Sequence, residues 1–234
     1  MSEKESIGIL VGAAPLGAEK QYIETLLNRE DAVSVAADGG LSFFADIRKC
    51  PDAWFGDGDS LGEEALRKAG DVFPDLLLSP CPKEKDDTDL RLAMLHFKAL
   101  GIREILIFGG LGGDRPDHTI ANIQLLHEFA EEGIRVFVVS EKEYLYVLTK
   151  GEKVRYKEET EGILSVFSLT DECSLAIRDL KYEFEGVINN RRVFTVSNEF
   201  NKKGGTVEIF EGTALIVRPV SFETDREHFS IGLF

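Results

Sequence analysis

Short apolar runs alternate with longer amphipathic stretches through roughly the first 140 residues of the chain. This alternation of buried-looking strands with helices predicts a parallel α/β sheet. The expected strands are Ile7–Val11, Ala32–Ala36, Ala53–Phe55, Leu76–Leu78, Glu104–Phe108 and Arg135–Val139. The expected helices are Glu19–Asn28, Gly40–Ile47, Glu63–Ala69, Thr88–Leu100 and Asp117–Glu131. Glycines at 101 and 133 stand where helix C-caps are expected.

The pattern changes after Ser140, where the apolar runs become short, β-branched and aromatic. They predict a small antiparallel sandwich or barrel, without a helix. The clearest of these runs are Gly162–Leu169, Arg192–Val196, Thr206–Phe210 and Ala214–Arg218. We therefore expect an α/β domain over residues 1–142 and a β domain over residues 143–234.

The composition limits the class of protein and its location. No apolar run reaches the eighteen or so residues of a membrane helix, and the polar start, Met1–Ser6, does not resemble a signal peptide. The three cysteines are odd in number and far apart, which disfavours a disulfide framework or a zinc site. These features predict a cytoplasmic protein without a membrane partner.

The formal net charge of −15 disfavours nucleic-acid binding, because such binding needs a basic surface. The same charge means that a polyphosphate ligand would need local cations, from Arg, from Lys or from metal ions.

Aspartates follow several of the predicted parallel strands. The carboxyl ends of parallel strands meet at one edge of a sheet, and ligands bind there. The acids placed at this edge are Asp38; Asp57 and Asp59; Asp86, Asp87 and Asp89; and Asp114 and Asp117. Converging carboxylates repel one another unless they bind a cation or take up protons, and oxygen ligands suit Mg²⁺. Taken singly, the Gly56–Ser60 run could be a solvated turn, and Lys85–Asp89 a charged helix start capped by Thr88.

Phosphate binding also needs donors, and the glycine-rich loop Gly109–Gly113 leads into the helix expected near Asp117. Glycine amides and a helix N-terminus form an anion site, to which Arg115 can add a forked contact. The sequence lacks a GxxxxGK[ST] motif, a complete GxGxxG at the first helix and a GxSxG motif. It thus offers a metal and phosphate site without an evident covalent nucleophile.

At these residues the chain resembles the thiamine pyrophosphokinases. The family's GDFDS-like, K-D-x-T-D and G-A-L-G-G-R-x-D-H-x-x-A-N motifs correspond here to Gly56–Ser60, Lys85–Asp89 and Gly109–Asn122. Leu180–Tyr182 and Ser197–Glu199 resemble the family's LKY and SNE elements. Two departures stand out: Gly58 replaces a bulky residue, and Asp114 lengthens the glycine loop before Arg115.

The resemblance implies a Rossmann-like nucleotide domain followed by a β-sandwich, and a homodimer with its active site at the interface. It also implies the transfer of diphosphate from ATP to thiamine with Mg²⁺. The catalytic residues would be Asp57, Asp59, Asp86, Asp89 and Asp117, of which Asp57, Asp59 and Asp89 would hold the metal. The ATP side would comprise Asp38, Gly39, Gly112, Gly113, Arg115, His118 and Asn122, and the thiamine side Ser197 and Asn198. Three alternatives stay open: a diphosphotransferase acting on a related alcohol, a non-catalytic thiamine or nucleotide sensor, and a Mg²⁺-dependent phosphohydrolase.

Overall fold

The computed structural model describes residues 6–56, 61–74, 76, 87–192 and 194–233. The chain is a mixed α/β protein with a large mixed sheet and a second, antiparallel sheet. It divides into two compact units: Met1–Leu125 with Ile134–Ser140, and Leu126–Gly133 with Glu141–Phe234.

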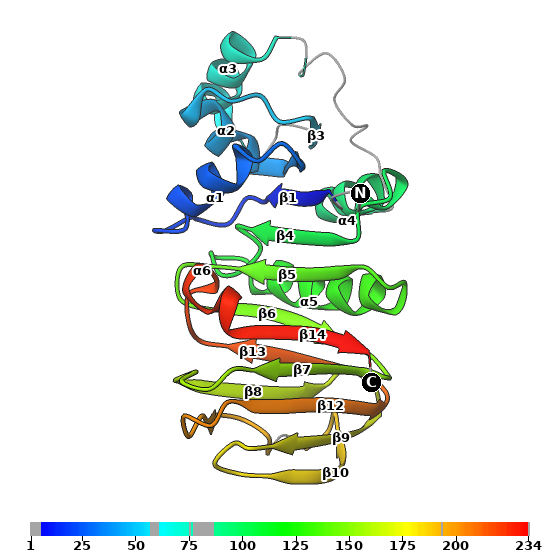
Figure 1. Ribbon diagram of the computed structural model, residues 1–234. Coiled ribbons are helices and arrows are strands. Elements are labelled where there is room, and N and C mark those ends of the chain that lie inside the picture. Colours follow the sequence, from blue (N-terminus) through cyan, green and yellow to red (C-terminus); the bar gives the residue numbers. More distant parts are fainter. Residues whose placement is uncertain (1–5, 57–60, 75, 77–86, 193, 234) are drawn as a thin grey trace. The chain divides into compact units, whose positions relative to one another are not determined.

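The first unit contains a parallel set of strands in the order β5-β4-β1-β2-β3 (Figure 1). The central strand β1 is buried at every position, which agrees with its uninterrupted apolar sequence. The elements are β1 (Ile7–Val11), α1 (Lys20–Leu27), β2 (Ala32–Ala37), the 3₁₀ helix η1 (Asp38–Gly40), α2 (Leu41–Ile47), β3 (Ala53–Phe55), α3 (Gly62–Val72), α4 (Asp89–Ala99), β4 (Glu104–Phe108), α5 (Pro116–Glu131, whose last turns fall in the second unit) and β5 (Arg135–Val139).

The parallel strands and the helices expected from the sequence are confirmed, with strands 7–11, 53–55, 104–108 and 135–139 matching to the residue. The expected strand Leu76–Leu78 lies, apart from Leu76, outside the described residues. Thr88 caps α4 as expected, because its hydroxyl accepts the Arg91 amide at 3.2 Å.

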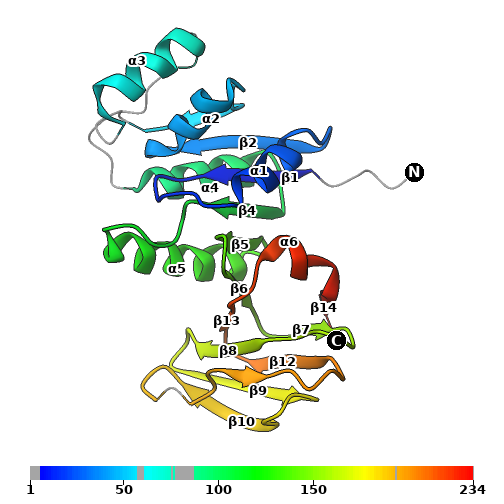
Figure 2. The ribbon, with the colours of Figure 1, turned by 90° about the vertical axis from the view of Figure 1, so that its left-hand side faces the viewer.

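The second unit consists largely of antiparallel strands. One set has the order β11-β8-β13-β6, and a five-stranded sheet has the order β10-β9-β12-β7-β14 (Figure 2). The elements are β6 (Tyr144–Leu148), β7 (Glu152–Tyr156), β8 (Ile163–Ser168), β9 (Glu172–Arg178), β10 (Phe184–Asn189), β11 (Asn198–Glu199), β12 (Gly205–Glu211), β13 (Ala214–Arg218), α6 (Phe222–Asp225), the 3₁₀ helix η3 (Arg226–His228) and β14 (Phe229–Leu233).

Aromatic residues from both sets of strands form the core of the second unit. The Tyr146 hydroxyl of β6 is 2.7 Å from the Tyr156 hydroxyl of β7. The rings of Tyr144 and Phe229 stack with their centroids 5.7 Å apart. Burial raises the pKa of all three tyrosines above the ordinary value of 10, so these hydroxyls act as neutral hydrogen-bonding groups.

Two expectations for the second unit are wrong. The expectation that it has no helix fails at α6, a single turn whose Phe222 is buried and packs edge-on against Tyr144. The run Arg192–Val196 does not form the expected strand, although Val193 lies outside the described residues. Thr195 there exchanges hydrogen bonds with Val166 alone, while β11 takes the neighbouring place beside β8.

Candidate active site

The strand order reverses between β1 and β4, and the loops that follow these two strands are joined by hydrogen bonds. Gly12 donates to the Phe108 carbonyl at 2.8 Å, and Ala14 donates to the Gly109 carbonyl at 3.0 Å. In an open parallel sheet, the crevice at such a reversal is the usual place for a ligand. The first unit therefore has its ligand edge where these loops meet.

Gly12 lies at the centre of this edge. A Cβ atom added to it would be 2.7 Å from the Gly109 carbonyl oxygen and 3.5 Å from the Leu90 side chain. A Cβ atom added to Gly40 would be 2.0 Å from the Val11 carbonyl oxygen and 3.0 Å from that of Gly12. Thus the segments after β1, β2 and β4 and the start of α4 meet at Gly12. Glycine is required here because backbone packs directly against backbone.

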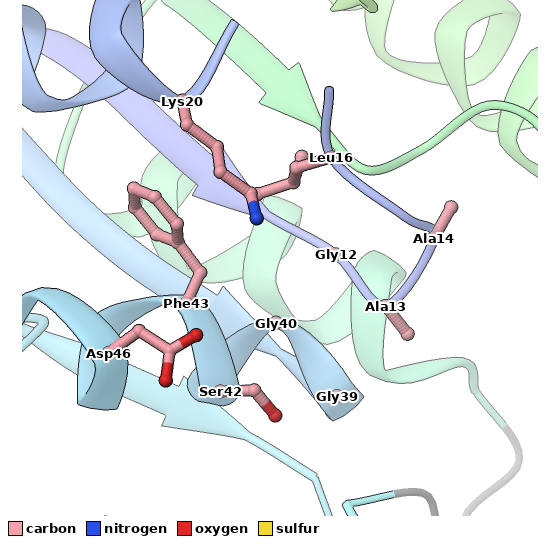
Figure 3. Close-up of a pocket in the computed structure, with 10 residues that line it drawn as sticks. All are labelled: Gly12, Ala13, Ala14, Leu16, Lys20, Gly39, Gly40, Ser42, Phe43 and Asp46. Atoms are coloured by element: carbon pink, nitrogen blue, oxygen red, sulfur yellow. The ribbon is translucent and has the colours of Figure 1, made fainter. Parts of the chain in front are cut away.

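A cavity of about 250 Å³ opens beside Gly12, between the loop after β1 and the start of α2 (Figure 3). Its lining consists of Gly12, Ala13, Ala14, Leu16, Lys20, Gly39, Gly40, Ser42, Phe43 and Asp46. Figure 3 shows the Lys20 amino group directed toward the interior of this group. Asp46, which also lines the cavity, pairs at 2.5 Å with Lys68, which does not. Among the lining residues, Lys20 is therefore the cation that faces an incoming anion.

Sequence analysis missed Lys20. It is a single cation at the start of a helix in a strongly acidic chain, and no motif marks it. The only signal was the general need for a local cation beside a polyphosphate, which does not point to a position.

Of the two residues expected on the nucleotide side after β2, Gly39 lines this cavity and Asp38 directly precedes it. Asp38 begins η1 with φ of 53°, and its carbonyl accepts the Trp54 indole N–H at 3.2 Å. This is a left-handed conformation that only a few residue types, Asp among them, adopt readily. Gly39 lines the cavity directly. The turn that follows β2 is thereby fixed against β3.

Asp89 occupies the first turn of α4. The side chain of the next residue, Leu90, would be 3.5 Å from a Cβ atom added to Gly12. Asp89 is half-buried, and Asp87 on the same helix start pairs with Arg91 at 2.7 Å. Three other acids of the expected catalytic and metal set, Asp57, Asp59 and Asp86, lie outside the described residues, whereas Asp117 is described. Among the residues that the structure describes, no group of three or more His, Cys, Asp or Glu side chains is placed to hold a metal ion.

The glycine loop after β4 carries most of the other expected ATP-side residues. Gly112 and Gly113 have φ of 77° and 78° and are exposed, as is His118. Gly113 also approaches the loop after β1, since an added Cβ would be 3.5 Å from the Pro15 side chain. Asn122 donates from its side-chain amide to the Gly110 carbonyl at 2.7 Å, so it holds the loop rather than pointing away from it.

Arg115 and Asp117 form a forked ion pair at the start of α5. Arg115 Nε and a terminal nitrogen reach the two Asp117 oxygens at 3.0 and 2.6 Å. This hydrogen bonding lowers the pKa of Asp117 from 3.8 to about 2. Both side chains are largely exposed. Asp117 is therefore ionised near neutral pH. To bind a phosphate, Arg115 must either donate to both groups or give up its hydrogen bonds to Asp117.

Ser197 and Asn198 lie in the second unit and differ in exposure. Ser197 is exposed, has φ of 54°, and donates its backbone N–H to Ser165 Oγ at 2.9 Å. Asn198 is only 5% exposed, and its side-chain amide bonds to the main chain of Tyr182 in both directions, at 2.7 and 3.0 Å. Ser197 is thus free to meet a ligand through its hydroxyl, whereas Asn198 fixes the loop that carries Tyr182.

Three comparisons with known proteins agree with one another. Residues 24–138 match the family described as thiamin pyrophosphokinase, catalytic domain. A thiamine pyrophosphokinase of Bacillus subtilis (strain 168) is 27% identical over 206 residues, covering 86% of this chain and 95% of the relative.

In the described part of the chain, no helix has both the length and the apolar character needed to cross a bilayer.

Solved structures extend the similarity to both units. A thiamine pyrophosphokinase structure from Bacillus subtilis superposes with a TM-score of 0.81 at 25% identity, covering 92% of this chain and 99% of that one. The Geobacillus thermodenitrificans structure gives 0.78 at 27% identity, with 92% and 98% covered. The yeast structure, at 16% identity and a TM-score of 0.74, shares the fold over 96% of this chain and 89% of its own. Together these matches identify the chain as a member of the thiamin pyrophosphokinase family.

Proposed function

We propose that the protein transfers a diphosphate group from ATP to the hydroxyl of thiamine, giving thiamine diphosphate and AMP. The observation that carries the proposal is the convergence of four chain segments on Gly12, beside a cavity that presents Lys20 and glycine backbone. This arrangement suits a polyphosphate, because backbone approaches closely and a cation stands nearby. The family membership supports the choice of substrates.

We assign the cavity beside Gly12 to ATP, with Gly39 against the nucleotide and Lys20 toward its phosphates. Gly112 and Gly113 lie on the neighbouring loop, where their amides and Arg115 can bind further phosphate oxygens. Asn122 holds that loop by its bond to Gly110. His118 and Asp38 remain proposed ATP-side residues, the first by its place at the start of α5 and the second by its place in the turn before Gly39.

Magnesium belongs to the proposal as well. Carboxylate oxygens are the donors that Mg²⁺ prefers, and the residues that would hold it are Asp57, Asp59 and Asp89. Of these, Asp89 is described, and its half-buried place at the Gly12 edge fits such a role. When bound, Mg²⁺ would offset negative charge on the phosphate oxygens. Asp86 is proposed to line the reacting centre.

The chemistry is a direct displacement. The thiamine hydroxyl oxygen forms a bond to the β-phosphorus, the bond from that phosphorus to the oxygen bridging to the α-phosphate breaks, and AMP leaves with that oxygen. The hydroxyl proton passes to a carboxylate, either Asp57 or Asp117. Because its pKa is lowered to about 2, Asp117 is a weak base. Whichever carboxylate accepts the proton, Asp117 also orients Arg115 through their forked pair.

We further propose that residues 1–142 form a Rossmann-like nucleotide domain and that residues 143–234 form a β-sandwich that binds thiamine. Ser197 is the proposed thiamine contact, and Asn198 supports it by holding the loop of Tyr182. A cytoplasmic location, which suits an ATP-using enzyme with scattered cysteines, stays part of the proposal.

A homodimer is proposed on the basis of an exposed apolar patch in the second unit. Tyr182, Val187, Phe194 and Val196 are each between 44% and 61% exposed. Val187 lies on β10, an edge strand of its sheet, and the ring of Phe194 packs edge-on against Phe184 of the same strand. Apolar and aromatic groups gathered at an edge strand are typical of protein interfaces. We propose that a second copy covers this patch and that the active site forms at the subunit interface.

The test is to incubate purified protein with ATP, Mg²⁺ and thiamine and to measure the nucleotide products. Equal amounts of AMP and thiamine diphosphate are expected. Release of ADP would rule out attack on the β-phosphorus, ATP cleavage without thiamine would indicate a phosphohydrolase, and thiamine binding without turnover would indicate a sensor. Asp59→Asn should nearly abolish turnover without unfolding the protein. A panel of related alcohols tests the specificity for thiamine.

A further inference from the structure

Arg218, the last residue of β13, carries a charge with no exposed surface. Its Nε donates to Asp225 Oδ2 at 2.9 Å, and the same oxygen accepts the Tyr144 hydroxyl at 2.6 Å. Buried ion pairs stabilise a protein little compared with apolar packing, and in some proteins they fix one arrangement over others. The pair therefore calls for an explanation other than stability.

The rest of the Arg218 guanidinium binds main chain. It donates to the Ile163 carbonyl at 2.5 Å and to the Glu161 carbonyl at 3.1 Å. These carbonyls flank Gly162, whose own carbonyl accepts the Phe200 amide at 3.1 Å. The guanidinium carbon also lies 4.6 Å from the centroid of the Phe200 ring, within the range of a cation–π contact. Arg218 thus holds the backbone on both sides of Gly162, the residue whose carbonyl accepts the Phe200 amide.

Phe200 directly follows β11, and β11 follows Ser197. The pairing of Asn198 with Leu164 places this segment on β8, whose first residues Arg218 holds. Ser197 has φ of 54°, a conformation that costs free energy in a residue with a side chain and persists only where the surroundings hold it. One source of support is the Ser165 hydroxyl, which also lies on β8. The shape of the Ser197 segment therefore depends on the position of β8.

We propose that Arg218 and Asp225 are positioning residues, which hold the segment Ser197–Phe200 in the shape that accepts the alcohol substrate. The inference rests on the proposed function, in which Ser197 contacts thiamine. Neither residue of the ion pair contacts substrate; both act through β8 and Phe200. Loss of the pair should therefore weaken the use of thiamine and leave the use of ATP unchanged.

Kinetics of two variants test this. Asp225→Asn keeps the side-chain shape and removes the charge, and Arg218→Lys keeps the charge and removes the fork. In both, KM for thiamine should rise about tenfold or more, since small displacements of binding groups have effects of this order, while KM for ATP stays within about twofold. The matched control is Glu208→Gln, which breaks the Lys153–Glu208 pair between β7 and β12. That pair is also largely buried, and its loss should leave KM for thiamine unchanged.

Hydrogen exchange followed by mass spectrometry tests the positioning without any substrate. In folded Asp225→Asn, amides of residues 197–200 should exchange faster than in the wild type, and in Glu208→Gln they should not. If Asp225→Asn does not fold, Tyr144→Phe, which removes the hydroxyl bond to Asp225, takes its place. Folded variants with unchanged exchange at 197–200, or with KM for ATP and thiamine raised equally, overturn the inference. If the wild type makes no thiamine diphosphate, the proposed function fails, and hydrogen exchange alone decides the positioning role.

Discussion

Replacing glycine by alanine at the ligand edge should destabilise the protein in proportion to the backbone overlap that the new Cβ creates. The distances to the nearest backbone oxygen are 2.0 Å at Gly40 and 2.7 Å at Gly12, against the 3.4 Å at which ordinary contact begins. At Gly232, an added Cβ has nothing within 4 Å. None of the three has a φ that excludes a side chain, so steric overlap is what separates them.

Overpacking of this kind costs about 1–3 kcal/mol, and we expect about 2 kcal/mol for Gly12→Ala. For a chain of this size, that lowers Tm by about 4–8 °C. Gly40→Ala should cost more, about 3 kcal/mol or above, because the overlap is twice as deep and the neighbour is the main chain of the central strand β1. Gly232→Ala should change Tm by about 2 °C or less, as most surface substitutions do.

Thermal unfolding followed by circular dichroism measures the three shifts, and denaturant unfolding measures the free energies. Since Gly12 and Gly40 line the cavity proposed to bind ATP, KM for ATP should rise in both variants, whereas Gly232→Ala should keep the wild-type value. Equal Tm values for Gly40→Ala and Gly232→Ala would refute the claim that backbone packs on backbone at this edge. So would an unchanged KM for ATP in folded Gly40→Ala.

Three further predictions concern charge and assembly. Lys20→Met should raise KM for ATP about tenfold and leave KM for thiamine unchanged, because Lys20 is the cation in the lining of the proposed ATP cavity; steady-state kinetics with each substrate varied measures this. Arg115→Gln should return the pKa of Asp117 from about 2 toward 3.8, as a carboxyl NMR titration would show. The sign follows from the lowered pKa: the pair contributes stability above pH 3.8 and loses it as the pH falls toward 2. Val187→Lys should convert the proposed dimer to a monomer in light scattering at micromolar concentration, and an unchanged mass would place the interface elsewhere.

The parallel strands were readable from the sequence because each is a short apolar run between polar segments. The strand 104–108 matched to the residue, since burial on both faces leaves an uninterrupted signal. The helix at 222–225 was not predicted because a single turn is too short to show a helical period in the sequence. The strand expected over 192–196 was wrong. Its β-branched residues favour a strand, but the strand that pairs with β8 at this edge is β11.

The candidate site was predictable to the extent that topology decides it. Residues that follow parallel strands must meet at one edge, and the convergence of the segments after β1, β2 and β4 at Gly12 agrees with that rule. Partnerships within the site were not predictable. The two-way bond of Asn198 to Tyr182 and the fork of Arg115 on Asp117 depend on side-chain geometry, which no spacing in the sequence records.

Five of the ten residues that line the proposed ATP cavity are glycine or alanine, so a ligand there meets peptide groups as well as side chains such as Lys20 and Ser42. Recognition by peptide groups survives most single substitutions, because a mutation changes what hangs from the chain and leaves the chain itself in place. At Ala13 and Ala14 a small replacement can therefore keep the ligand, whereas at Gly12 and Gly40 even alanine is too large. An inhibitor meant to be selective would do better to contact side chains, such as Lys20 in the cavity or those around Ser197.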